Sequence, residues 1–184
     1  ADFFETTFQF NNSISISGSS NAMTYRLGYT NFDTSGMLPN SKLNKDIVNF
    51  NGTLKVNDKF KVGTSTNLVL QSTRGRNSTG YSDNLMSQFR QWWQVNVDIK
   101  DMKDIFELTG KNYSWNHEGG LYQGRSVLQP HYWDNPYWTR YKNFQTDNRN
   151  RVYGNVWGTY SITSALDFTL KAALDTYSEL REER

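Results

Sequence analysis

Hydrophobic and polar residues alternate along the first part of the chain with a period of two. Over residues 4–17 the even positions are mostly aromatic or aliphatic, and every odd position is polar. Only a β-strand places successive side chains on opposite faces. The run exceeds the length usual in soluble sheets, about 5 or 6 residues, and reaches the length of about 9 to 11 residues with which a tilted strand crosses a bilayer.

Five further stretches repeat this alternation. In one of them, Val48, Phe50 and Leu54 fall on one face and Asn49 and Asn51 on the other. Such segments, bounded by turn residues, are typical of strands. We therefore expect six strands, at about residues 4–17, 22–31, 44–56, 59–72, 150–162 and 166–180.

The links between the expected strands alternate in length. Short links at residues 18–22, 57–58 and 163–165 separate a longer one at 32–43 and a very long one at about 73–147. Outer-membrane barrels join their strands by short periplasmic turns and longer extracellular loops. The pattern predicts an all-β fold, an antiparallel transmembrane β-barrel segment with one long extracellular loop. Its first strand runs inward and its last strand runs outward.

Composition is consistent with a barrel and excludes a bundle of transmembrane helices. Only 36% of the 184 residues are hydrophobic, mean hydropathy is −0.77, and no window approaches 18 apolar residues. The aromatic share of 15% fits interfacial girdles and rings that stack on sugars or partners. A net charge of +2 gives no footprint for nucleic acid, and the absence of cysteine excludes disulfides and thiol chemistry.

Several spaced motifs resemble the barrels of SusC/RagA-type TonB-dependent outer-membrane transporters. They are Ser13 to Gly18, Thr24 to Arg26, Gly36 to Ser41, Phe89 to Gln94, Val97 to Lys100, Tyr132 to Trp138, and Asp147 to Asn155 leading into Tyr177 to Arg184. These motifs cover essentially the whole chain in order. The resemblance implies part of a large plugged barrel of about 22 strands in the Gram-negative outer membrane.

The resemblance also implies a function and partners. Such proteins import glycans or peptides with energy from the TonB complex, and a SusD-like surface lipoprotein covers their extracellular mouth. The sequence shows no plug domain, TonB box or closing strands, so we expect a partial barrel that follows the plug and at least one strand. TonB would then act through an N-terminal region outside these 184 residues.

Two sets of residues are candidates for contact with a ligand or partner. Aromatic rings in the long loop would stack on substrate or contact the lipoprotein, unless they pack on one another as a loop core: Trp92, Trp93, Trp115, Tyr132, Trp133, Tyr137 and Trp138. Polar residues on the inward face would line the lumen, contact the plug or simply be hydrated: Gln9, Asn11, Arg26, Asn49, Asn51, Asn67 and Gln71.

Nothing in the sequence points to catalysis or a cofactor. His117 and His131 lie in the long loop without a zinc-binding pattern, and no P-loop, dinucleotide fingerprint or nucleophile elbow is present. Asp98, Asp101 and Asp104 fit the polar face of a short helix, with a calcium site as the alternative. We expect no enzyme, no metal and no cofactor.

Two other functions fit parts of the pattern. A free-standing small barrel of about eight strands, serving as an adhesin or structural protein, would need two further strands in the long loop. A soluble carbohydrate-binding β-sandwich would use the tryptophan and tyrosine rings as its binding platform. A barrel enzyme ranks behind both, because no catalytic constellation is present.

Overall fold

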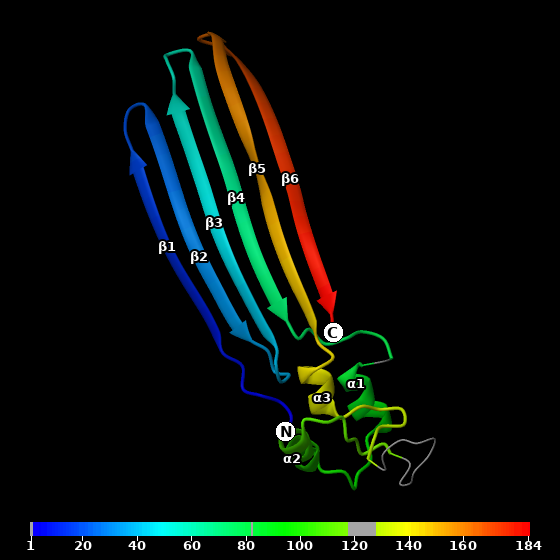
Figure 1. The fold of residues 1–184 in the computed structure, drawn as a ribbon. Helices are drawn as coiled ribbons and strands as arrows, with labels where there is room; N and C mark the ends of the chain where they lie inside the picture. The colour runs from blue at the N-terminus through cyan, green and yellow to red at the C-terminus, as the bar shows by residue number, and fades with distance from the viewer. Residues whose placement is uncertain (1, 82, 118–127) are drawn as a thin grey trace.

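The computed structural model describes residues 2–81, 83–117 and 128–184 (Figure 1). Six strands form one antiparallel sheet, and their order in space is their order in the sequence. The strands are β1 (Gln9–Ser19), β2 (Met23–Ser35), β3 (Lys42–Lys55), β4 (Phe60–Arg74), β5 (Gln145–Thr163) and β6 (Leu166–Glu183).

The described helices all lie between β4 and β5, in a region that we call the helical segment (residues 75–144). They are α1 (Leu85–Ser87), the π-helix η1 (Gln88–Trp92), α2 (Ile99–Thr109) and α3 (Pro136–Tyr141). The sheet is a long single layer, and the helical segment sits at one end of it, where both chain termini also lie (Figure 1).

The predicted six strands and their alternating links are confirmed. Links 20–22, 56–59 and 164–165 close one end of the sheet, whereas links 36–41 and 75–144 lie at the end with the helices. The sheet is open, and its outer strands β1 and β6 do not pair with each other in the described residues. The structure therefore shows a mostly β, antiparallel sheet without barrel closure.

The predicted start of the first strand is wrong. The strand begins at Gln9 instead of residue 4, because the N-terminal residues before it pack against the helical segment. Phe3 is buried, with its ring 4.9 Å from that of Phe89 and 5.2 Å from that of Tyr137. The Glu5 amide donates a hydrogen bond to the Met37 carbonyl at 2.8 Å. Alternation at the start of the run reflects ring packing here and not a strand.

The other strands extend further toward the helices than predicted. The link expected at 32–43 spans only 36–41, and the last strand continues to Glu183. Polar cross-strand pairs support these extensions, such as Lys42 to Asp33 at 3.3 Å and Gln145 to Glu183 at 2.9 Å. Because most residues of these ends are polar, hydrophobic alternation could not reveal them.

The buried hydrophobic residues lie outside the strands. Phe3, Leu85 and Tyr137 form a small core, and Leu38, Phe89, Ile99, Met102 and Phe106 pack around it. In the described part of the helical segment there are helices and no strand, so the two further strands of a small barrel do not occur there. The described residues also form one sheet, where a sandwich requires two.

Candidate functional site

A buried arginine attaches the helical segment to the end of the sheet. Arg140 of α3 is 3% exposed, and its Nε donates to the Pro39 carbonyl at 2.8 Å. Its guanidinium also donates to Ser41 Oγ at 3.1 Å and to the Gly75 carbonyl. In return, the side-chain amide of Asn40 donates to the Arg140 carbonyl at 2.7 Å. Burial lowers the pKa of Arg140.

Gly75 ends β4 in a conformation that suits glycine. Its φ is +65°, and a Cβ placed there would lie 2.0 Å from the Asn40 carbonyl oxygen. Its own amide donates to the Gln145 carbonyl at 2.8 Å. The chain can therefore leave β4 beside link 36–41 only because no side chain is present at this position.

Asn135 fixes the start of α3 against the rest of the helical segment. Its side chain is fully buried, and Oδ1 accepts the Tyr137 amide at 2.8 Å, which caps the helix. Its Nδ2 donates to the carbonyls of Met102 at 2.8 Å and Tyr113 at 2.9 Å. One side chain thus joins α2, α3 and the chain between them.

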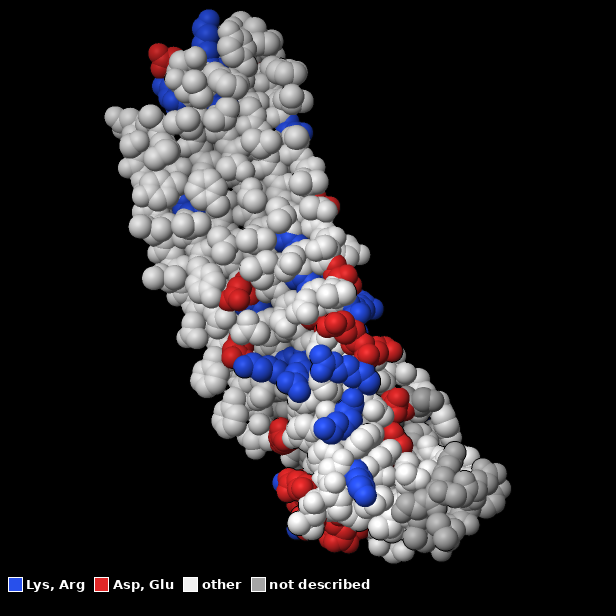
Figure 2. Space-filling view, viewed as in Figure 1, with Lys and Arg blue, Asp and Glu red and all other residues white. Residues whose placement is uncertain are grey.

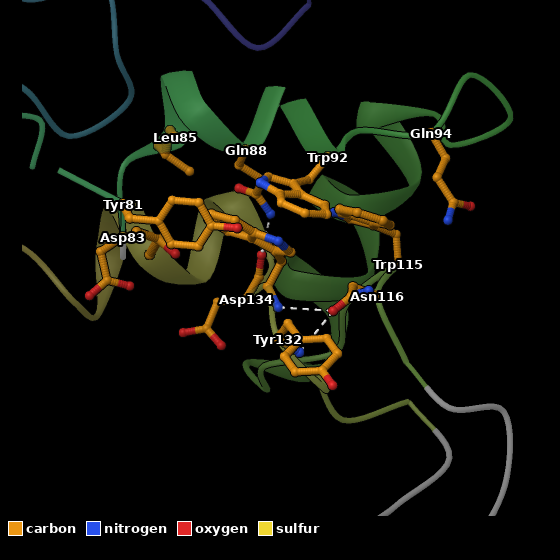
Figure 3. A pocket seen from close by; sticks show the side chains of 12 residues that line it. Tyr81, Asp83, Leu85, Gln88, Trp92, Gln94, Trp115, Asn116, Tyr132 and Asp134 are labelled. Atoms are coloured by element: carbon orange, nitrogen blue, oxygen red, sulfur yellow. Dashed lines mark hydrogen bonds between the residues drawn. The ribbon is translucent and has the colours of Figure 1, made fainter. Parts of the chain in front are cut away.

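The helical segment encloses a pocket of about 510 Å³ (Figure 3). That volume falls within the range of about 300 to 1,000 Å³ typical of small-molecule sites. The residues that line the pocket come from the start, middle and end of the helical segment. They are Tyr81, Asp83, Leu85, Gln88, Trp92, Gln94, Trp115, Asn116, Tyr132, Trp133, Asp134 and Thr139.

Four of the seven predicted rings line this pocket: Trp92, Trp115, Tyr132 and Trp133. The Trp92 and Trp133 rings lie 6.3 Å apart, and Tyr81 lies 5.4 Å from Trp133. Tyr132 is 79% exposed and Trp92 46%, so both offer ring surface to solvent. The structure brings these rings together although they lie far apart in the sequence.

The other three predicted rings pack against neighbouring rings. This is the alternative that the sequence left open, in which the rings form a core of the loop. The ring of Trp93 lies 5.1 Å from Phe89. Tyr137 is 5% exposed in the small core, where burial raises its pKa to about 12. Trp138 lies 6.5 Å from Phe106 and lines a different hollow.

Sequence reasoning missed the acidic side of the pocket. Asp83 lies just before α1 with φ of +53°, a left-handed conformation that is uncommon outside glycine. Asp134 lies within the predicted aromatic motif, and its two oxygens accept the side-chain amides of Asn112 at 2.8 Å and Asn143 at 3.1 Å. No local pattern joins two aspartates this far apart in sequence, so only the fold could identify them as a pair.

The surroundings of Asp83 disfavour its negative charge. Although the side chain is exposed at the mouth of the pocket, the nearby protein desolvates the carboxyl enough to raise its pKa. The charges of Asp134 and Glu183 raise that pKa further. At the other side of the pocket, the buried Nε1 of Trp115 has no hydrogen-bond partner among the described residues. The pocket therefore has an acidic mouth and an unsatisfied donor among its rings.

All seven residues predicted to face the lumen lie on one face of the sheet. The register pairs Arg26 with Asn51 and Asn49 with Asn67, and Gln9, Asn11 and Gln71 continue the same face toward the helical segment. Near that end, Arg181 lies 3.5 Å and Arg76 3.2 Å from Asp147. Figure 2 shows charged side chains gathered in a band where the sheet meets the helices.

The opposite face carries apolar side chains in register across the strands. One row consists of Ile14, Tyr29, Val48, Leu68 and Val152. Many of these side chains remain exposed, including Ile14 at 71% and Leu170 at 69%. No described segment of the chain packs over this face.

The described residues contain no group of three His, Cys, Asp or Glu side chains that could hold a metal ion. Asp98 instead caps α2, accepting the Lys100 amide at 2.9 Å, and His117 and His131 belong to no such group. Within the same residues, no helix has the length and hydrophobicity to cross a membrane.

No protein-family model matches the sequence, and a search of curated proteins finds no match.

Proposed function

We propose that this chain is part of the wall and the outer mouth of a TonB-dependent outer-membrane importer of the SusC/RagA type. The observation that carries the proposal is the uncovered apolar face of a sheet whose other face is polar. In water such a face would cost about 25 cal/mol for each Å² left exposed. Lipid removes that cost, because hydrocarbon tails cover apolar side chains while the polar face turns to a lumen.

Strand length and link length support the same proposal. The strands contain 11 to 19 residues, enough to cross a bilayer and extend beyond it. Short links at one end and long links at the other match the periplasmic and extracellular ends of such barrels. The open edges of β1 and β6 would pair with strands from outside these 184 residues, since unpaired backbone groups are costly in lipid.

The helical segment supports a role at the extracellular mouth. Three of the resembling motifs meet there, because Leu38, Phe89 and Tyr137 belong to one hydrophobic cluster. On this proposal the exposed rings near the pocket contact a glycan or peptide substrate, or the SusD-like lipoprotein. The polar face of the sheet lines the path inward or holds the plug.

Surface labelling in cells tests the location and the orientation together. We would introduce one cysteine at Asp104, exposed on α2, and another at Asp58, 95% exposed in the turn at the opposite end of the sheet. A membrane-impermeant maleimide should label Asp104→Cys on intact cells and Asp58→Cys only after permeabilisation, with both proteins in the outer-membrane fraction. Labelling in the reverse order, or recovery of both proteins in a soluble fraction, would contradict the proposal.

A further inference from the structure

The pocket of the helical segment combines π faces with negative charge. Five of its lining residues are aromatic and two are aspartates, and the described lining contains no lysine, arginine or histidine. Asp83 and Asp134 line the same pocket as the Tyr81 ring, and Figure 3 shows their carboxylates on the same side of the view. We infer that this pocket binds an organic ammonium ion.

The exposed rings are suited to a cation of low charge density. Tyr81 is 58% and Trp92 is 46% exposed, so each has ring surface open to a ligand at the pocket. The face of an aromatic ring attracts an alkylammonium group within about 6 Å of its centre, and tryptophan does so most strongly. The apolar part of such an ion would also pack against these rings and be shielded from water, which favours binding.

The two aspartates supply the charge that such a ligand would neutralise. Asp134 is held in place by the amides of Asn112 and Asn143, both neutral groups, and among the described residues no ion pair involves its carboxylate. Asp83 lines the same pocket, and the charge of Asp134 contributes to the raised pKa of Asp83. A cation between them relieves their repulsion, whereas a neutral or anionic ligand does not.

A metal ion fits these residues less well than an organic cation. Metal sites of hard cations need several oxygen ligands at close range, and here both oxygens of Asp134 already accept hydrogen bonds. Five of the other described lining residues are aromatic, which favours a large and weakly hydrated cation. The ammonium group could belong to an amino sugar or to a peptide, and both would offer the same charge.

Calorimetric titration of the full-length protein in detergent tests the inference. Choline should bind, and its neutral isostere 3,3-dimethylbutan-1-ol should bind at least about fivefold more weakly, as expected for a lost cation–π and charge interaction. Glucosamine and lysine methyl ester, each compared with its N-acetylated form, identify the carrier of the ammonium group. Equal affinity for choline and its isostere, or binding of glucose without choline, would overturn the inference.

One substitution separates the charge from the shape of the site. Asp83→Asn keeps the size of the side chain, and asparagine tolerates the left-handed backbone. It should weaken choline binding about fivefold or more, since it removes one of the two charges. The matched change Asp104→Asn on α2 should leave binding unaffected. Unchanged affinity in Asp83→Asn would overturn the inference.

The inference rests on the proposed function only in assuming that the pocket faces the outside of the cell. Titration with purified protein does not depend on orientation, whereas surface labelling of Asp104→Cys and Asp58→Cys does not depend on the pocket. Failure of the titration with the expected labelling would therefore reject the ligand and keep the importer. Binding of choline together with reversed labelling would reject the importer and keep the site.

Discussion

The sheet and the helical segment bury their apolar residues by different means. In the helical segment, Leu85 and Tyr137 are at most 5% exposed, and the Tyr137 ring packs on that of Phe3. In the sheet, Ile14 and Leu170 remain 71% and 69% exposed, although their strands β1 and β6 each pair with a neighbouring strand. The difference shows that the buried core lies at the helical segment, whereas the apolar face of the sheet is left exposed by the described residues, in keeping with the proposed contact with lipid.

The largest effect should come from placing a charge on the apolar face. Phe50→Lys should destabilise the assembled protein by about 2 to 4 kcal/mol near the middle of the bilayer, and Leu54→Lys or Leu170→Lys should behave similarly. Asn49→Lys, one residue away on the polar face, should cost little. Denaturant unfolding in lipid vesicles gives the difference, and equal stability of Phe50→Lys and Asn49→Lys would break the assignment of the two faces.

Removing Arg140 should detach the helical segment without unfolding the sheet. Arg140→Met leaves the Pro39 carbonyl without its donor and removes one of two donors from the Gly75 carbonyl, which also accepts from Ser41 Oγ, at a cost of about 2 to 3 kcal/mol. The matched change Arg90→Met, at an exposed arginine of η1, should cost much less. Limited proteolysis should cleave the helical segment of Arg140→Met faster. Equal cleavage rates in the two variants would show that this contact does not join the two regions.

Gly75 and Gly110 have similar positive φ values, so replacing each by alanine separates backbone strain from steric collision. Gly75→Ala should destabilise the junction by about 1 to 3 kcal/mol, because a methyl group would meet the Asn40 carbonyl in addition to the unfavourable φ. Gly110 has φ of +61° and open space around it, so Gly110→Ala tests the backbone conformation alone. The melting temperature of Gly75→Ala should lie below that of Gly110→Ala. The reverse order would argue against the close approach of Gly75 to the Asn40 carbonyl.

The smallest effect concerns the N-terminal residues beside the helical segment. Lys100 lies 3.1 Å from Asp2, and its hydrogen bond and charge lower the pKa of that carboxyl. Because the pKa of Asp2 is lowered, the pair stabilises the folded state at a pH above 3.8, the usual pKa of the group. This contribution is lost as the pH falls through the lowered pKa. Salt should weaken it as well, since both groups are exposed.

Hydrogen exchange at the Glu5 amide, which donates to the Met37 carbonyl, measures this tether. Asp2→Asn should speed exchange slightly at pH 7, relative to the original protein, and the ratio should approach one in strong acid. Asp104→Asn, with the same change of charge, should leave the ratio at one throughout. A ratio for Asp2→Asn that does not depend on pH would exclude the ion pair as its cause.

The sequence predicts the sheet well because alternation is a local property of each strand. It identifies six strands and places Gln9, Arg26 and Asn67 on one face, which the register confirms. Prediction fails where alternation has another cause or is missing. The rings before Gln9 pack into the helical segment, and the polar strand ends near Glu183 are held by cross-strand pairs.

The pocket is only partly predictable because its residues meet through tertiary contacts. Composition and position indicate the exposed rings, such as Trp92 and Tyr132, but do not separate them from Tyr137, which is buried. Asp83 and Asp134 lie far apart in the sequence and line one pocket only in the folded structure. No pattern within one segment contains that information.

The central claim is that the apolar face of the sheet meets lipid and the polar face meets water. Because these 184 residues contain no cysteine, single spin labels can be placed at Leu68→Cys and Asn67→Cys, adjacent residues of β4. In vesicles, the Leu68 label should be relaxed mainly by oxygen and the Asn67 label mainly by a water-soluble nickel complex. Equal accessibility of the two labels to both reagents, or the reverse pattern, would contradict the account.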